Sequence, residues 1–202
     1  MHQVEGTKGY AEATERFIEA TAAINFKELH QDFIGFIPTK PGRVLDVGAG
    51  IGRDAAVFAG MGHAVVAVEP TADFRVAARR LYDSPNIAWV DDALPMLAGL
   101  GRQADQFDFV LASAVWHHLD HVEQEDAMQR IFELVCPEGV FALSLRHGPS
   151  GVGTHVFPTH GQQTVDRAEA CGFSTLLCRP NQPSLLKGKE EVRWTRLVFV
   201  KS

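Results

Sequence analysis

The 202-residue sequence contains little cysteine, no excess of positive charge and no long apolar segment. Its three cysteines form no Cys-x-x-Cys pair, so we expect reduced, mostly buried thiols, without disulfides or a bound metal. The formal net charge of −6 disfavours nucleic acids and anionic membranes as partners, because both usually require a basic surface. No apolar stretch is long enough to cross a bilayer and no signal-peptide pattern follows Met1, which predicts a cytoplasmic protein.

What the sequence does contain is an ordinary globular composition, 46% hydrophobic and 22% charged. A chain of this length can bury one good core, whereas division into two units would leave two small ones. We therefore expect a single domain over residues 1–202. Within it, residues 1–41 are predicted to form a helical lid and residues 42–202 a core.

From residue 42 onward, short apolar runs alternate with amphipathic segments. Runs rich in Val, Leu and Phe predict strands that are buried on both faces. They fall at residues 43–47, 64–68, 86–90, 107–112, 140–145, 173–179 and 195–200, with helices expected at 54–60, 71–81, 123–135 and 160–171. The alternation predicts an α/β fold, a doubly wound Rossmann-like sheet of seven mostly parallel strands. The last two runs lack a helix between them and should form an antiparallel hairpin at one edge.

The first forty residues have a different pattern. Residues 8–23 place Tyr10 and Phe17 at helical spacing, and residues 26–37 do the same with Phe33. The pattern predicts two helices ahead of the sheet. They could pack on the sheet or form a lid over a ligand, and the sequence leaves both roles open.

A glycine-rich segment carries the strongest functional signal. Asp46-Val47-Gly48-Ala49-Gly50-Ile51-Gly52-Arg53-Asp54 joins a predicted strand to a predicted helix. Glycines let the backbone approach a ligand closely, and a helix start offers free N–H groups to a carboxylate or phosphate. Glu69 ends the next predicted strand, where an acid can accept hydrogen bonds from both hydroxyls of a ribose. The pattern predicts a nucleotide-binding loop.

Two cofactors compete for this loop. The segment from Gly50 to Ala55 also matches the G-x-G-x-x-A fingerprint of dinucleotide binding. Asp46, however, would repel a pyrophosphate and attract the ammonium group of an adenosyl amino acid. Asp91 and Asp92 follow the third predicted strand and offer acceptors to an adenine amino group, or else they cap a short helix at residues 93–99. The balance favours S-adenosylmethionine over a nicotinamide dinucleotide. A binding protein without catalysis is a third possibility, but the intact loop and ribose acid count against it.

These residues resemble the motifs of the class I S-adenosylmethionine-dependent methyltransferases. Residues 44–52 are similar to the family's first motif, and residues 107–113 to its fourth-strand motif. Residues 134–140 are similar to the turn before the fifth strand, with Glu138 in place of the usual first glycine, a change expected to cost little. The chain looks most like a bacterial branch of small methyltransferases, marked by Gly52-Arg53-Asp54, Trp116-His117-His118, Ser144-Leu145-Arg146-His147-Gly148 and Trp194.

The resemblance implies S-adenosyl-L-methionine as cofactor and a specific set of residues to hold it. Asp46 would hold the amino group through water, Arg53 would reach the carboxylate and Glu69 would bind the ribose. The complete cofactor-binding set is Asp46, Gly48, Ala49, Gly50, Gly52, Arg53, Glu69, Pro70, Asp91, Asp92, Ala93 and Ser113.

The acceptor pocket should lie outside the carboxyl ends of the strands, beside the cofactor. A base that removes a proton there must titrate near neutral pH, which makes histidine the first candidate. The candidate bases are His117, His118 and His147, although each could merely pack or hydrogen-bond locally. The candidate substrate-binding residues are Tyr10, Trp116 and Arg146. Because the chain is acidic and shows no appended recognition domain, we expect methylation of an O, N or S atom of a small molecule, by a monomer or a homodimer.

Overall fold

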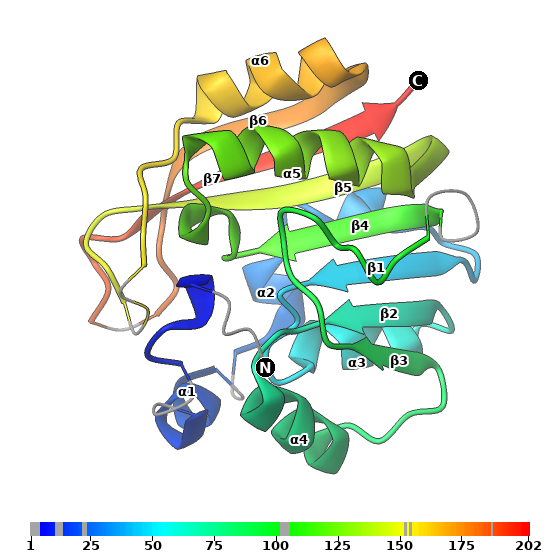
Figure 1. Cartoon of the computed structure of the whole chain (residues 1–202), viewed down its shortest axis with the longest axis vertical. Helices are drawn as coiled ribbons and strands as arrows, with labels where there is room; N and C mark the ends of the chain where they lie inside the picture. Colours follow the sequence, from blue (N-terminus) through cyan, green and yellow to red (C-terminus); the bar gives the residue numbers. More distant parts are fainter. Residues whose placement is uncertain are drawn as a thin grey trace.

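The computed structural model describes residues 5–10, 14–21, 24–101, 106–151, 153, 155–186 and 188–202. Seven strands form one sheet in the order β3-β2-β1-β4-β5-β7-β6 (Figure 1). They are β1 (Arg43–Val47), β2 (Ala64–Val68), β3 (Ile87–Val90), β4 (Phe107–Ser113), β5 (Val135–His147), β6 (Phe173–Pro183) and β7 (Arg193–Lys201). The strands β1 to β5 run parallel, and β7 is antiparallel to both of its neighbours. The predicted α/β fold and its antiparallel edge hairpin are confirmed.

Helices cover both faces of this sheet (Figure 1). The helices that follow strands are α3 (Arg53–Gly60), α4 (Ala72–Leu81), α5 (His121–Leu134) and α6 (Gly161–Cys171). One core cluster joins the sheet to α5 and α6, and the other joins it to α3 and to α2 (Phe26–Leu29). No helix among the described residues has the length and apolarity needed to span a membrane.

The start of α5 shows how local sequence fixes these elements. Asp120 accepts hydrogen bonds from the backbone N–H groups of Val122 and Glu123, and the Glu123 carboxylate accepts one from the Asp120 N–H. This capping box satisfies donors that a helix start leaves free. It fixes where the chain turns after β4, which is the segment that carries three of the candidate site residues.

The prediction for the N-terminal helices was wrong in extent. In place of two long helices the structure has η1 (Glu5–Thr7), α1 (Thr14–Thr21), α2 and η3 (Ile34–Phe36). Residues 11–13, 22 and 23, which the first predicted helix included, lie outside the described residues. The second helix ends after one turn at its C-cap His30, and turns and then η3 follow it, although His30 and Phe33 are both only 1% exposed. The buried residues thus keep a helical spacing along a segment whose backbone is only partly helical.

Three smaller expectations were also wrong. Strand β6 is at the sheet edge, so its residues after the buried Phe173 are only partly buried or exposed, instead of being buried on both faces. All three cysteines are free thiols. Cys178 on that strand is exposed, and the other two are only partly buried. Residues 93–99 form turns and not a helix.

The segment predicted to be a turn lies within the first residues of β5, and it does not accommodate its glutamate as freely as expected. Glu138 has a φ of +62°, the left-handed conformation that favours glycine. A side chain there costs roughly 1–2 kcal/mol. The following Gly139 is required for space, because a Cβ would lie 2.8 Å from the Cys136 carbonyl oxygen and 2.9 Å from that of Phe107.

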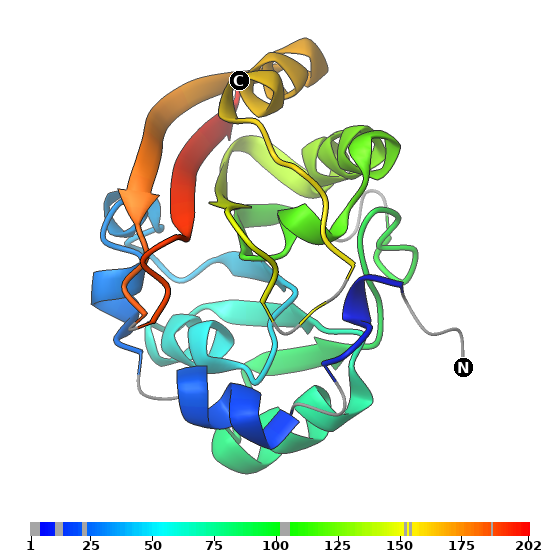
Figure 2. The same cartoon turned by 90° about the vertical axis from the view of Figure 1, so that its left-hand side faces the viewer.

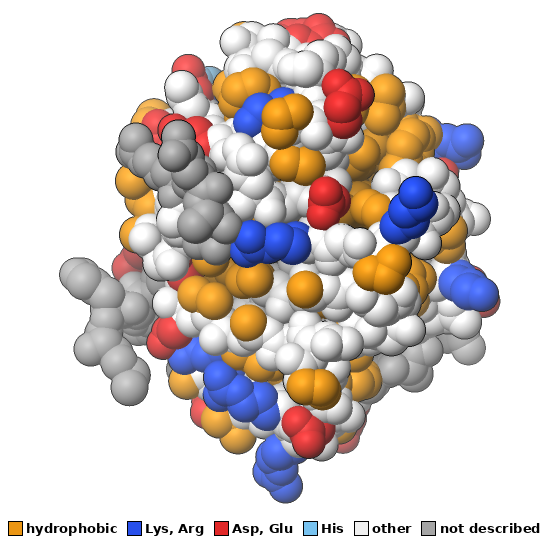
Figure 3. All heavy atoms as spheres, turned by 90° about the vertical axis from the view of Figure 1, so that its right-hand side faces the viewer, with side chains coloured by type: hydrophobic (Ala, Val, Ile, Leu, Met, Phe, Trp, Pro, Cys, Tyr) orange, Lys and Arg blue, Asp and Glu red, His pale blue; other side chains and the backbone are white. Residues whose placement is uncertain are grey.

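The two ends of the sheet differ. Figure 2 looks onto the carboxyl ends of the parallel strands, where the N-terminal segment and the loop between β5 and α6 both lie. Figure 3 looks onto the opposite end, where charged side chains of both signs are scattered among hydrophobic ones. The candidate residues gather at the carboxyl ends, as a doubly wound sheet requires.

Candidate active site

The glycine loop is tied to the end of β2 by backbone hydrogen bonds. Gly48, Gly50 and Gly52 have φ angles of +69°, +57° and +82°, which explains why glycine occupies each position. The N–H groups of Gly48 and Ala49 both donate to the Val68 carbonyl oxygen at 2.9 Å. The loop is therefore held in place from the neighbouring strand.

Two of the glycines serve packing within the protein. A Cβ on Gly52 would lie 2.8 Å from the Trp89 ring of β3, and one on Gly48 would lie 3.0 Å from the Val115 side chain. Gly50 has a different partner, since its N–H donates to the Glu69 carboxylate at 2.9 Å. The three predicted glycines thus lie in one loop, where Gly48 and Gly52 allow close packing and Gly50 binds the Glu69 carboxylate.

Asp46 lies in β1, an interior strand of the sheet, and is 2% exposed. Burial raises the pKa of its carboxyl well above the usual value, and the nearby Asp54 raises it further, while Arg53 lowers it. One of its oxygens, Oδ2, is buried without a hydrogen-bond partner among the described residues. An ammonium group, directly or through water, would satisfy that oxygen, so the site fits the amino end of S-adenosylmethionine.

Glu69 lies at the end of β2 and is 5% exposed. Its carboxylate accepts hydrogen bonds from the N–H groups of Gly50 at 2.9 Å and Thr71 at 2.7 Å. Burial raises the pKa of the carboxyl, and these hydrogen bonds oppose the rise. The predicted ribose acid is therefore held against the glycine loop, with lone pairs still available for hydroxyl groups.

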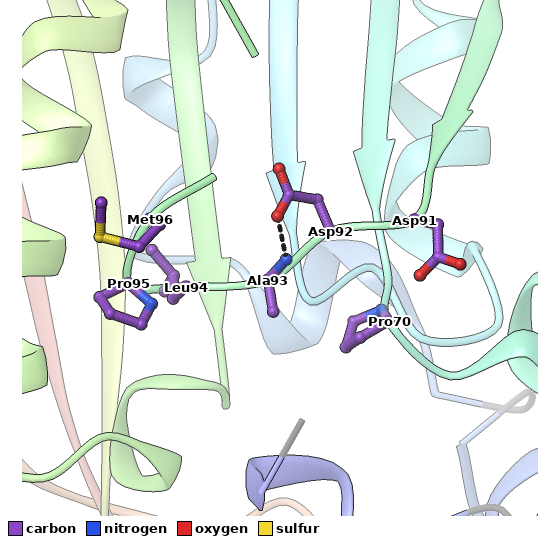
Figure 4. Close-up of a pocket in the computed structure, with 7 residues that line it drawn as sticks. All are labelled: Pro70, Asp91, Asp92, Ala93, Leu94, Pro95 and Met96. Atoms are coloured by element: carbon purple, nitrogen blue, oxygen red, sulfur yellow. Dashed lines mark hydrogen bonds between the residues drawn. The ribbon is translucent and has the colours of Figure 1, made fainter. Parts of the chain in front are cut away.

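A cavity of about 280 Å³ lies outside the ends of β2 and β3, beside Pro70, the residue that follows Glu69 (Figure 4). Its lining contains the predicted adenine-binding residues; it consists of Pro70, Asp91, Asp92, Ala93, Leu94, Pro95 and Met96. Asp92 accepts hydrogen bonds from the N–H groups of Ala93 and Gly99, both at 2.8 Å, so it shapes this loop. Asp91 forms a bidentate ion pair with Arg75, which sequence analysis missed.

Arg53 and Asp54 connect the glycine loop to the N-terminal segment. The Arg53 Nε contacts Asp54 at 2.7 Å, and the Arg53 Nη1 donates to the Thr21 carbonyl oxygen at 3.4 Å. His30 Nε2 lies 2.8 Å from the second Asp54 oxygen. Burial alone would raise the pKa of Asp54, but the hydrogen bonds of His30 and Arg53 lower it to about 2. Sequence analysis missed His30, whose only signal was a polar residue within an apolar helix face.

On the acceptor side, Tyr10 and His118 form a hydrogen-bonded pair. Tyr10 Oη lies 3.0 Å from His118 Nε2, and His118 Nδ1 lies 2.7 Å from the His155 carbonyl oxygen. Since a carbonyl only accepts, Nδ1 carries the proton and Nε2 accepts from the tyrosine. Gly153 packs against both rings, because a Cβ there would lie 2.7 Å from Tyr10 and 2.8 Å from His118. Burial raises the pKa of Tyr10 to about 12.

The other two candidate bases lie in less suitable places. His117 is buried, its Nδ1 has no partner among the described residues, and burial lowers its pKa to about 2. The His147 ring lies between Thr195 Oγ1, at 2.8 Å from Nε2, and Thr159 Oγ1, at 3.4 Å from Nδ1. Burial lowers its pKa as well. His118 differs from both because its Nε2 lies within hydrogen-bonding distance of the Tyr10 hydroxyl.

The remaining candidates fall into two groups. Trp116 is fully buried in the hydrophobic core beside Phe141, so its ring is not exposed to an acceptor. Ser113 ends β4, the strand next to the glycine loop, with a partly exposed side chain. Arg146, next to last in β5, borders a second cavity of about 510 Å³.

Comparisons with known proteins identify a family and similar folds. The family described as "methyltransferase domain" matches residues 17–169. A TehB-like S-adenosylmethionine-dependent methyltransferase of Corynebacterium glutamicum is 20% identical, with a TM-score of 0.67, over 96% of this chain and 98% of the other. The 1,6-didemethyltoxoflavin-N1-methyltransferase of Burkholderia thailandensis, solved with its substrate and S-adenosylhomocysteine, is 17% identical with a TM-score of 0.65, over 100% and 92%.

A third similar structure comes from Haloferax volcanii, solved in complex with the Trm112 methyltransferase activator. It is 12% identical, with a TM-score of 0.73, over 100% of this chain and 99% of the other. A search of curated proteins found no match.

The fold and the loop define a class I S-adenosylmethionine-dependent methyltransferase. The chain belongs to the methyltransferase-domain family, and S-adenosylmethionine is its cofactor. The alternative interpretation of the sequence, a nicotinamide-dependent oxidoreductase, is therefore wrong. Among the described residues there is also no group of three or more His, Cys, Asp or Glu side chains placed to hold a metal ion.

Proposed function

We propose that this enzyme methylates an O, N or S atom of a small molecule, bound between the cofactor, the N-terminal segment and the loop of residues 148–159. The observation that carries the proposal is the hydrogen-bonded pair of Tyr10 and His118, which Gly153 of that loop covers. Because segments of the chain itself lie around this pair, the space beside it suits a compact acceptor. The toxoflavin-precursor methyltransferase that shares the fold acts on a small molecule, which also supports the proposal.

In this proposal the cofactor lies along the carboxyl ends of β1 to β4. Asp46 binds its ammonium group, Glu69 its ribose, and the cavity beside Asp91, Asp92 and Ala93 its adenine. The bound cofactor supplies an activated methyl group. Because Arg53 is held by Asp54 and Thr21, it orders the loop and is a weaker candidate for the methionine carboxylate than its position in the sequence suggested.

His118 is the proposed base. Its Nε2 carries no proton, and burial lowers its pKa, so the ring is neutral at physiological pH. The acceptor's proton passes to Tyr10 Oη as the tyrosine proton passes to His118 Nε2, and the His155 carbonyl stabilises the resulting imidazolium through Nδ1. Such a base contributes about 10²–10⁴-fold. Tyr10 contacts the acceptor directly and aligns it.

Two measurements test the proposal in order. Calorimetry with S-adenosylhomocysteine and, separately, NADH should show heat only for the first; tight NADH binding without it would overturn the cofactor assignment. Incubation with methyl-tritiated S-adenosylmethionine and a fractionated cell extract should then label material of low molecular mass. Label confined to protein or nucleic acid would contradict a small-molecule acceptor.

A further inference from the structure

The Arg146 guanidinium, at the acceptor side of the site, has no carboxylate partner in the part of the chain that the structure describes. The side chain is partly buried, and Arg146 Nη1 donates a long hydrogen bond, of 3.5 Å, to the Gly148 carbonyl oxygen. Among the ion pairs of the described residues none includes Arg146. A partly buried cation that has no carboxylate partner among the described residues carries a desolvation cost, which a bound anion would offset.

The surroundings of Arg146 are neutral or apolar. The 510 Å³ cavity that it borders is also lined by Val156, Phe157 and Pro158. His147 lines it as well, and burial lowers the pKa of that imidazole, so the ring is uncharged at neutral pH. The volume lies within the range of small-molecule sites. Arg146 therefore provides a single fixed positive charge beside an otherwise uncharged cavity.

This cavity adjoins the proposed base. The loop between β5 and α6 contributes Val156 and Phe157 to the cavity and the His155 carbonyl to His118. The Phe157 N–H also donates to the His117 carbonyl at 2.8 Å. Arg146 is close enough to Tyr10 to interact electrostatically with its hydroxyl. A group bound at Arg146 would thus belong to the molecule whose reactive atom lies at Tyr10.

We propose that the acceptor carries a carboxylate or phosphate on an apolar body, and that Arg146 binds this anionic group. The inference rests on the proposed function, since it names the acceptor class of that site. The planar guanidinium suits both oxyanions because it can donate two parallel hydrogen bonds. Phe157, Val156 and Pro158 would contact the apolar part.

Calorimetry on the protein saturated with S-adenosylhomocysteine tests this with three probes of similar shape: benzoate, phenyl phosphate and the uncharged benzamide. We expect at least one anion to bind at least tenfold more tightly than benzamide. Arg146→Gln should remove that preference, and Arg146→Lys should keep part of it. Arg80→Gln, the same charge change at an exposed position of α4, should behave like the wild type. The preferred anion distinguishes a carboxylate from a phosphate acceptor.

Four outcomes of this calorimetry would contradict the inference or the proposed function. Equal binding of anions and benzamide, or an anion preference that survives in Arg146→Gln, would overturn the inference. A tenfold loss of S-adenosylhomocysteine affinity in Arg146→Gln would also overturn it, because Arg146 would then bind the cofactor's carboxylate. If the wild-type protein does not bind S-adenosylhomocysteine at all, the proposed function itself has failed.

Discussion

Around the glycine loop the contacts are largely made by backbone groups, whereas around Tyr10 and His118 they join side chains and loops far apart in sequence. Gly48, Ala49 and Gly50 donate their N–H groups to the end of β2, a strand that follows within twenty residues. Tyr10 and His118 are 108 positions apart. The cofactor side is thus built from neighbouring segments, and the acceptor side from distant ones.

That difference explains how one fold can keep its donor and vary its acceptor. Backbone contacts survive most side-chain replacements, so amino-acid substitutions in other parts of the chain should affect the cofactor side little. The acceptor side depends on a few side chains presented by the N-terminal segment and one loop, and both can change without disturbing the sheet. Changes on the cofactor side should therefore affect donor binding, and changes on the acceptor side should affect turnover.

Gly50→Val should give the largest effect. Valine is strained at a φ of +57°, and its side chain would enter the space where the loop meets the ligand. We expect S-adenosylhomocysteine affinity to fall by roughly 100-fold or more. Gly60→Val, at the end of α3 where a Cβ would meet nothing within 4 Å, is the matched control. If calorimetry shows wild-type affinity for Gly50→Val, the cofactor binds elsewhere.

His118→Asn tests the acceptor side. Turnover should drop by about 10²–10⁴-fold, with S-adenosylhomocysteine affinity unchanged. Because burial lowers the pKa of His118 below its usual 6.5, the active neutral form predominates above that pKa. Wild-type kcat/KM should rise with pH through a value below 6.5 and then stay level, and the variant should lack this rise.

His121→Asn, at the exposed first residue of α5, is the control for that experiment. It should keep both the turnover and the pH profile of the wild type. If His118→Asn turns over normally as well, the base is another group. His147→Ala would then be the next variant to measure.

Glu69→Ala returns to the cofactor side with a smaller change. Removal of a charged acceptor from the ribose, and from the N–H groups of Gly50 and Thr71, should weaken S-adenosylhomocysteine binding by about 1.5–3 kcal/mol. Glu125→Ala, on the exposed surface of α5, should have no effect in the same titration. Unchanged affinity in Glu69→Ala would remove this carboxylate from the site.

The same contrast separates what the sequence could predict from what it could not. Apolar runs of strand length predicted the strands of the sheet, since a strand buried between two helical layers is apolar on both faces and leaves a continuous run in the sequence. The glycines, Asp46 and Glu69 could be found because each is fixed by its distance from a strand end. Their positions in the structure follow that prediction closely.

Other features depend on contacts between distant segments and could not be predicted. The pairing of Tyr10 with His118 requires knowing that the N-terminal segment lies over the carboxyl ends of the strands. The burial of His117 and Trp116, next to His118 in sequence, depends on which way one short turn faces. Glu138 looked harmless because no pattern reveals a positive φ. The sequence provided no reason to prefer one of the three candidate histidines as the base. They differ in how their rings are packed in the folded chain.

Asp54→Asn tests the contact that links the N-terminal segment to the glycine loop. The pKa of Asp54 is about 2 in the folded chain, below the usual 3.8, so its ionised form stabilises the fold above pH 4. That contribution, about 2 kcal/mol, disappears as the pH falls from about 4 toward 2. Urea denaturation at pH 7 should show Asp54→Asn less stable by about this amount, and the difference from wild type should shrink toward pH 3.

Asp126→Asn, an exposed carboxylate on α5, should leave the unfolding free energy unchanged at either pH. If Asp54→Asn unfolds like the wild type at pH 7, the hydrogen bonds of His30 and Arg53 do not stabilise the folded chain. If instead it is destabilised and also binds S-adenosylhomocysteine more weakly, the N-terminal segment and the glycine loop are coupled. The cofactor side would then depend on one long-range contact of the kind that otherwise defines the acceptor side.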